Sequence, residues 1–151
     1  MKNLWTGVAL LALLSPFHAQ AALGGRVASV ESDRAQMKGT LQTRQTALYS
    51  IHEIKGTSGV MVREYVSPAG MVFGVGWRGL YVPDLQQLLG AYFEQYAEGV
   101  KAQKTGYVGR RPLNLQLPGL VVQMNGHMRA INGRAYVPEQ VPLGMKLEEL
   151  Q

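Results

Sequence analysis

Apolar and polar residues alternate along the first half of the chain in a way that favours β-strands. The stretches "ALYSIHEI", "GVMVREYV" and "MVFGVGW", from residue 47 onward, are rich in β-branched and aromatic residues, and the last two alternate. Between these two lie Ser67-Pro68-Ala69-Gly70, with Pro and Gly at the positions that a type I turn favours. The second and third stretches are therefore predicted to form a hairpin.

The pattern then changes to a helical period in "VPDLQQLLGAYFEQYAEG". Apolar and aromatic residues recur there at steps of three and four: Leu85, Leu88, Leu89, Tyr92, Phe93 and Tyr96. This spacing predicts an amphipathic helix over residues 84–98, with Asp84 as its N-cap and Gly99 as its C-terminal stop. Gly90 lies inside the helix, where it allows close approach to a neighbouring element.

A shorter helix is predicted near the start of the domain. Its residues recur at the same helical steps: Val27, Val30, Arg34, Met37 and Leu41. Either Ser29 or Ser32 can cap it.

Turn signals divide the second half of the chain into short strands. After a basic loop at residues 101–112, the strands are separated by Pro118-Gly119 and by Asn125-Gly126 and Asn132-Gly133, which favour type I′ hairpin turns. We therefore predict an α+β fold in a single domain. An antiparallel sheet of hairpins packs against the central amphipathic helix (84–98) and the short N-terminal helix.

The first 21 residues predict export from the cytoplasm. They contain Lys2, an apolar run from Leu4 to Leu14, and small residues ending in Ala19-Gln20-Ala21, the features of a signal peptide cleaved after Ala21. The run is too short for a membrane-spanning helix, and an uncleaved anchor is the alternative. Residues 22–151 then form one periplasmic or secreted domain. The sequence allows a flexible C-terminal tail from about residue 139.

Composition and charge narrow the chemistry. The chain has no cysteine, so it contains neither a disulfide nor a thiol nucleophile. Its net charge is +5, and no acidic residue lies between Glu98 and Glu139. Six cations lie in that interval: Lys101, Lys104, Arg110, Arg111, Arg129 and Arg134. They suggest an anion patch for an envelope polymer, and a solvated face is the alternative. Nucleic acid is disfavoured because aromatic stacking residues are scarce.

Gly74, Gly76 and Gly79 have the spacing G-x-G-x-x-G of dinucleotide-binding turns. The first two, however, alternate with large side chains and are predicted to lie within a strand, whereas the fingerprint needs a turn that leads directly into a helix. No cofactor is predicted. The two glycines leave a strip of sheet without side chains, on which we expect the helix of residues 84–98 to pack.

Catalytic residues are sparse. His52, Glu53 and Glu64, with Arg63, lie on neighbouring predicted strands and could converge as a base, an acid or a metal site. Polar residues on strand faces are the alternative explanation. The spacing predicts no metal site, and the serines lack the context of a nucleophile elbow.

Four blocks together resemble a known family. They are "ALGG", "VREYVSPAGMVFGVGWRG", "VPDLQQLLGAYF" and "GHMRAINGRAYVP". In this order they are similar to a family of exported proteins of Gram-negative bacteria, catalogued as a domain of unknown function. The resemblance covers most of residues 22–138 and implies export, a single domain and no established activity. It also implies small or apolar residues at positions 74 and 76, so the glycine triplet is interpreted as accidental.

These observations lead to two functional hypotheses. The first is an exported, non-enzymatic binding or accessory module of the cell envelope, whose partner is an anionic envelope polymer or another exported protein. The second is a hydrolytic or lytic enzyme that acts on envelope material through His52, Glu53 or Glu64 with Arg63.

Overall fold

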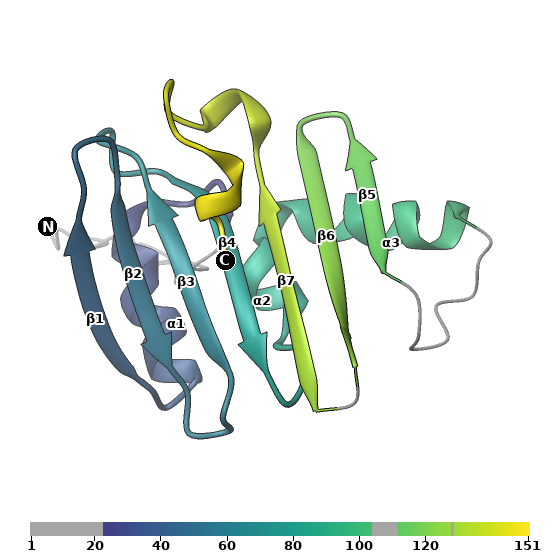
Figure 1. Ribbon diagram of the computed structural model, residues 1–151, viewed down its shortest axis with the longest axis horizontal. Helices are drawn as coiled ribbons and strands as arrows, with labels where there is room; N and C mark the ends of the chain where they lie inside the picture. Colours follow the sequence, from purple (N-terminus) through teal and green to yellow (C-terminus); the bar gives the residue numbers. More distant parts are fainter. Residues whose placement is uncertain (1–22, 104–111, 128) are drawn as a thin grey trace, which may run out of the picture.

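The computed structural model describes residues 23–103, 112–127 and 129–151. Its described strands form one antiparallel sheet in the order β1-β2-β3-β4-β7-β6-β5 (Figure 1). They are β1 (Thr40–Gln45), β2 (Ser50–Lys55), β3 (Met61–Val66), β4 (Val72–Gly79), β5 (Leu113–Leu117), β6 (Leu120–His127) and β7 (Ala130–Tyr136). The predicted α+β class is confirmed.

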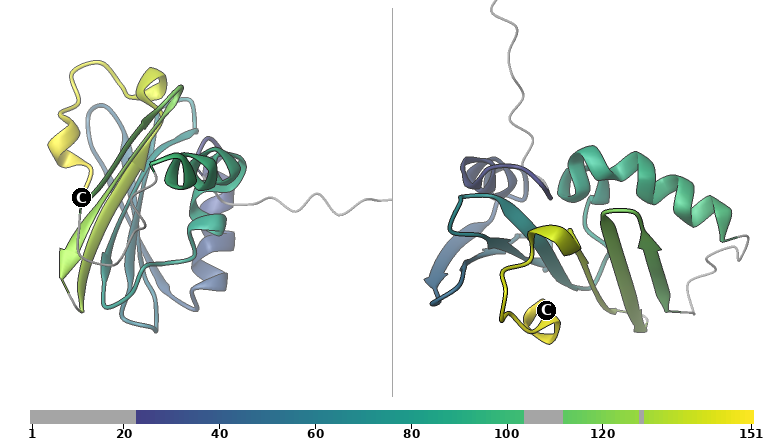
Figure 2. Two further views of the ribbon diagram at one scale, coloured as in Figure 1. Left: turned by 90° about the vertical axis from the view of Figure 1, so that its right-hand side faces the viewer. Right: turned by 90° about the horizontal axis from the view of Figure 1, so that it is seen from above.

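Helices cover one face of this sheet. They are α1 (Val30–Gln36), α2 (Leu85–Leu89) and α3 (Phe93–Ala102), with 3-10 turns before α1 (Val27–Ser29) and between α2 and α3 (Gly90–Tyr92). Figure 2 shows α1 and α3 on one side and the chain after β7 on the other. We call these two sides the helix face and the tail face. No helix among the described residues is long and apolar enough to cross a membrane.

The predicted central helix exists but differs at two glycines. Asp84 caps α2 as predicted, because its Oδ1 accepts a hydrogen bond from the backbone N–H of Gln87 at 3.1 Å. Gly90 adopts a φ of 50° and interrupts the helix. The prediction that Gly99 ends the helix is wrong: α3 continues to Ala102, and Gly99 packs against Leu117 of β5, where a Cβ would lie 3.0 Å from a Leu117 methyl.

The predicted short N-terminal helix is also present, but its cap differs. Ser29 occupies the N-cap position of α1 without bonding the amides of the first turn. Its hydroxyl instead donates to the carbonyl oxygen of Arg26 at 2.5 Å. The prediction that Leu41 continues the helical pattern is wrong, because α1 ends at Gln36 and Leu41 belongs to strand β1.

Two of the predicted turns are confirmed and two are wrong. Ser67 to Gly70 joins β3 to β4, and Pro118-Gly119 joins β5 to β6 with Gly119 at a φ of 72°. The two Asn-Gly pairs lie inside β6 and β7, where Asn125 pairs with Asn132 in the register. The turn therefore falls between them, with Arg129 at a φ of 66°.

The segment 138–151 folds back across the tail face. Leu150 is 1% exposed and packs with Tyr49, Tyr65 and Phe73. The Tyr65 hydroxyl accepts a hydrogen bond from the backbone N–H of Gln151 at 3.0 Å and donates to the carbonyl oxygen of Glu149 at 2.9 Å. The Tyr65 hydroxyl thereby holds Glu149 and Gln151 against strand β3.

This segment fills the strip without side chains on β4. A Cβ at Gly74 would lie 2.9 Å from a Leu150 methyl, and one at Gly76 would lie 2.8 Å from the Gln151 backbone. The two glycines are strand residues, as predicted. The expectation that the central helix packs on them is wrong, since the helices lie on the opposite face of the sheet.

Candidate functional site

The residues predicted as weak catalytic candidates divide between the two faces. His52 and Glu64 are register partners on β2 and β3, and so are Glu53 and Arg63. Adjacent residues of a strand point to opposite faces, so the first pair faces the helices and the second faces the tail. The structure therefore does not bring the four side chains into one site.

His52 is held by neighbouring hydroxyls. Its Nδ1 lies 3.2 Å from the Thr43 hydroxyl and its Nε2 lies 3.1 Å from the Ser50 hydroxyl. Burial lowers the pKa of His52 because it disfavours the imidazolium. Both ring nitrogens thus lie within hydrogen-bond distance of hydroxyls on β1 and β2.

Glu53 and Arg63 form an ion pair that supports the tail. Arg63 Nε lies 2.8 Å from Glu53 Oε2, and this hydrogen bond holds the pKa of Glu53 below its usual range. Arg63 Nη1 also donates to the Gln151 carbonyl oxygen at 3.2 Å. The pair thus connects β2 and β3 to the end of the tail segment.

A buried carboxyl pair lies between α1 and β3. Asp33 and Glu64 are both fully buried, and the Gln87 side-chain amide donates to Asp33 Oδ1. If both groups are ionised, Asp33 Oδ2 and both Glu64 oxygens have no hydrogen-bond donor among the described residues. Burial and the charge of Asp33 hold the pKa of Glu64 well above its usual range, and burial also raises the pKa of Asp33. A proton on Glu64 supplies the missing donor.

Sequence reasoning missed this pair because Asp33 lies in a short helix and Gln87 lies 54 residues further along. Neither carboxyl reaches the solvent, so the pair does not form a site that a large substrate can enter. Among the described residues, no cluster of three or more His, Cys, Asp or Glu could hold a metal.

The six predicted patch cations do not gather on one described surface. Lys104, Arg110 and Arg111 lie outside the described residues. Lys101 is exposed on α3, in the helix layer, and Arg129 is exposed in the β6–β7 turn. Arg134 lies on the tail face. Arg134 is among the residues that line a pocket on this face.

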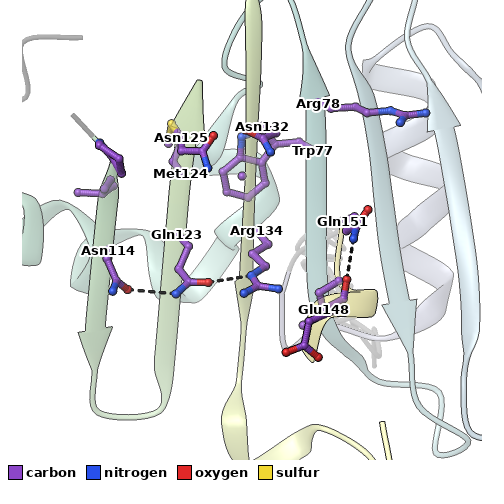
Figure 3. A pocket seen from close by; sticks show the side chains of 14 residues that line it. Trp77, Arg78, Asn114, Gln123, Met124, Asn125, Asn132, Arg134, Glu148 and Gln151 are labelled. Atoms are coloured by element: carbon purple, nitrogen blue, oxygen red, sulfur yellow. Dashed lines mark hydrogen bonds between the residues drawn. The ribbon is translucent and has the colours of Figure 1, made fainter. Parts of the chain in front are cut away.

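That pocket opens on the tail face over β4, β7, β6 and β5, beside the tail segment (Figure 3). We call it the open-face pocket; its volume is about 710 Å³. The backbone of one cross-strand row forms its floor: Trp77, Gly133, Met124 and Leu113. The side chains of Trp77, Met124 and Leu113 point away from the pocket, into the core between the sheet and the helices. Gly133 is required in this row, because a Cβ there would lie 2.4 Å from the Trp77 ring.

A hydrogen-bonded ladder of side chains forms one wall of the pocket. Asn114, Gln123 and Arg134 are register partners on three adjacent strands. Gln123 Nε2 donates to Asn114 Oδ1 at 3.2 Å, and Arg134 Nε donates to Gln123 Oε1 at 2.8 Å (Figure 3). Arg134 Nη1 donates to the Leu147 carbonyl oxygen at 2.5 Å, so the ladder continues into the tail segment.

The opposite wall is polar and exposed. It is a second row on the same face, consisting of Asn125, Asn132 and Arg78. The tail contributes Glu148, Leu150 and Gln151 at the remaining side. The side chains of the pocket therefore present amides, two guanidinium groups and one carboxylate. Amides and carboxylates form hydrogen bonds to hydroxyls, and amides and guanidinium groups donate to acidic groups.

The sequence contained part of this arrangement. In "LNLQL" Asn114 alternates with leucines, which indicates a strand with one polar face. The ladder itself depends on the strand register, which puts residues from three strands side by side, and no local pattern specifies that register.

Comparison with known proteins assigns the chain to a family. A family described as "Protein of unknown function (DUF2844)" matches residues 19–150, and the chain belongs to it. No curated protein and no solved structure matches the chain.

Proposed function

We propose that this member of the DUF2844 family is an exported accessory protein of the cell envelope that binds an anionic carbohydrate polymer without cleaving it. The binding site in this proposal is the open-face pocket. Export rests on the leader-like residues 1–21 of the sequence.

The observation that carries the proposal is the composition of the pocket walls. Five amide side chains line it: Asn114, Gln123, Asn125, Asn132 and Gln151. Amides both donate to and accept from sugar hydroxyls, and arginine pairs with carboxylate or sulfate through two N–H groups. Arg78 and Arg134 outnumber Glu148, so the pocket favours an acidic chain. Its volume is within the range of small-ligand sites.

The alternative, a lytic enzyme, has weaker support. Hydrolysis of a glycosidic bond generally uses two carboxyl groups on either side of that bond. Glu148 has the one side-chain carboxylate among the described residues that line the open-face pocket. His52 and Glu64 lie on the helix face, away from this pocket. Binding therefore explains the geometry better than cleavage does.

Titration calorimetry with an acidic polysaccharide, polygalacturonate, tests the proposal, with neutral dextran as a second probe. The key variant is Arg78→Ala, because Arg78 is exposed and has no ion pair within the described residues. Loss of one charge-assisted contact weakens binding by about tenfold or more. Arg44→Ala is the matched control, since it removes an exposed arginine of β1 outside the pocket.

We expect the wild-type protein to bind polygalacturonate more weakly as salt rises, and Arg44→Ala to bind like the wild type. An equal loss in both arginine variants would show that only net charge matters, and the pocket assignment would be wrong. A steady release of reducing ends during incubation would instead support the lytic alternative.

A further inference from the structure

A short apolar segment is exposed between β4 and α2. Leu80, Tyr81 and Val82 are 45%, 63% and 39% exposed. Single exposed apolar residues are common on protein surfaces, whereas three in succession form a contiguous patch. Pro83 follows, and Asp84 then starts α2, so the chain leaves the sheet here before it returns to the helix layer.

This segment lies at the end of the sheet where several connections between strands and helices come together. The β2–β3 connection reaches it, because Gly59 lies near a Leu80 methyl. Gly79 pairs with Ile131, which places the β6–β7 turn with Arg129 at the same end. The α1–β1 connection lies beside the β2–β3 connection, where the Thr57 backbone N–H donates to the Met37 carbonyl oxygen at 3.4 Å. Figure 1 shows these connections along its lower side. We call this the loop edge.

The charge of the loop edge is positive. Its exposed cations are Lys38, Lys55, Arg78 and Arg129. Lys55 is paired with Glu53 at 3.4 Å, and the others have no ion pair within the described ranges. Asp84 is the one carboxylate in the described part of these connections, and its side chain caps α2.

We propose that the loop edge docks reversibly on the surface of an anionic lipid bilayer. Leu80, Tyr81 and Val82 enter the boundary between headgroups and acyl chains, where tyrosine is favoured because its ring is apolar and its hydroxyl is polar. The surrounding cations face the anionic headgroups, whose attraction for lysine and arginine adds to the burial of the apolar residues.

The charge of the loop edge favours an anionic bilayer as its binding partner. A second copy of the chain would bring the same cations against each other, which disfavours a symmetric contact between two loop edges. An anionic bilayer is complementary to both the apolar tip and the cations around it. The loop edge shares Arg78 with the open-face pocket, but Tyr81 and Lys38 do not line that pocket, so variants at these two positions test docking separately from carbohydrate binding.

Sedimentation with vesicles tests this docking. One set of vesicles contains phosphatidylglycerol and phosphatidylcholine, and the other contains phosphatidylcholine alone. We expect the wild-type chain from residue 22 to bind the first set much more strongly, and to be released by salt. Tyr81→Ser should weaken binding severalfold, and Lys38→Gln should weaken it about fivefold, as expected for one cation near the surface.

Leu143→Ser is the matched control, because Leu143 is 95% exposed in the tail segment, outside the loop edge. It should bind like the wild type. In a second measurement, the fluorescence of Tyr81→Trp should be quenched by brominated acyl chains when vesicles are added. Binding of Tyr81→Ser at wild-type strength, or unchanged fluorescence of Tyr81→Trp, would overturn the proposal. So would a wild-type dimer in ultracentrifugation that Tyr81→Ser disperses, since the occupant would then be a second copy.

Discussion

The buried carboxyl pair predicts an unusual dependence of stability on pH. Burial raises the pKa of both Asp33 and Glu64, and Glu64 is raised furthest above the ordinary range of a glutamate. A carboxyl with a raised pKa binds its proton more tightly in the folded state. Its contribution to stability is therefore complete below the pKa of the unfolded chain, and it is lost as pH rises through the folded pKa.

The magnitude follows from proton linkage. While the folded protein holds one more proton than the unfolded chain, the free energy of unfolding falls by about 1.4 kcal/mol per pH unit. The total loss grows by this amount for each pH unit by which the folded pKa of Glu64 exceeds its value in the unfolded chain. Total stabilities of about 5–15 kcal/mol make such a change measurable.

Glu64→Gln isolates this effect, because its amide can donate to Asp33 without ever losing a proton. Urea unfolding followed by circular dichroism between about pH 5 and pH 8 gives the free energy of unfolding of each protein. We expect Glu64→Gln to gain stability relative to the wild type as pH rises. His52, the register partner of Glu64, is unchanged in both proteins.

Glu98→Gln provides the control, since it removes the same charge from an exposed position of α3. Its stability should stay at a constant offset from the wild type over the whole pH range. If the Glu64→Gln and wild-type curves were also parallel, Glu64 would ionise normally, and the assignment of a buried proton to it would be wrong.

Two further predictions concern glycines of the sheet. Gly133→Ala should lower the free energy of unfolding by about 1–3 kcal/mol, because the new methyl would overlap the Trp77 ring; an unchanged urea midpoint would contradict this packing. Leu150→Ala should cost about 2–5 kcal/mol through a cavity on the tail face. Gly74→Ala should then destabilise the Leu150→Ala protein less than the wild type, and additive losses in this double-mutant cycle would show that the two positions do not touch.

The predictable part of the fold is the part encoded by local patterns. The hairpin at Ser67 to Gly70 and the N-cap at Asp84 were recognised because the residues that form them are close in sequence. Strand β1 (Thr40–Gln45) was missed because it is an edge strand with little apolar alternation, exposed except for the half-buried Leu41. Its conformation is determined by pairing with β2, and such pairing overrides weak local propensity.

The Asn-Gly turns failed for a related reason. Asn-Gly favours a tight turn, but a turn at Asn125-Gly126 would separate Met124 from its register partner Gly133, and that row supports the Trp77 ring. The register that keeps this row together therefore places the turn at Arg129, which has a φ of 66°, and not at Asn125-Gly126. Burial of a large aromatic residue outweighs the preference of a two-residue turn.

The same argument explains why the candidate site could not be predicted in full. Alternation along β4 indicates that Gly74 and Gly76 leave one face of the sheet open, but it does not identify what covers that face. The cover is Leu150 and Gln151, more than seventy residues away along the chain. Their position gives the open-face pocket its third side, so the site depends on a long-range contact between a glycine strip and a segment with little pattern of its own.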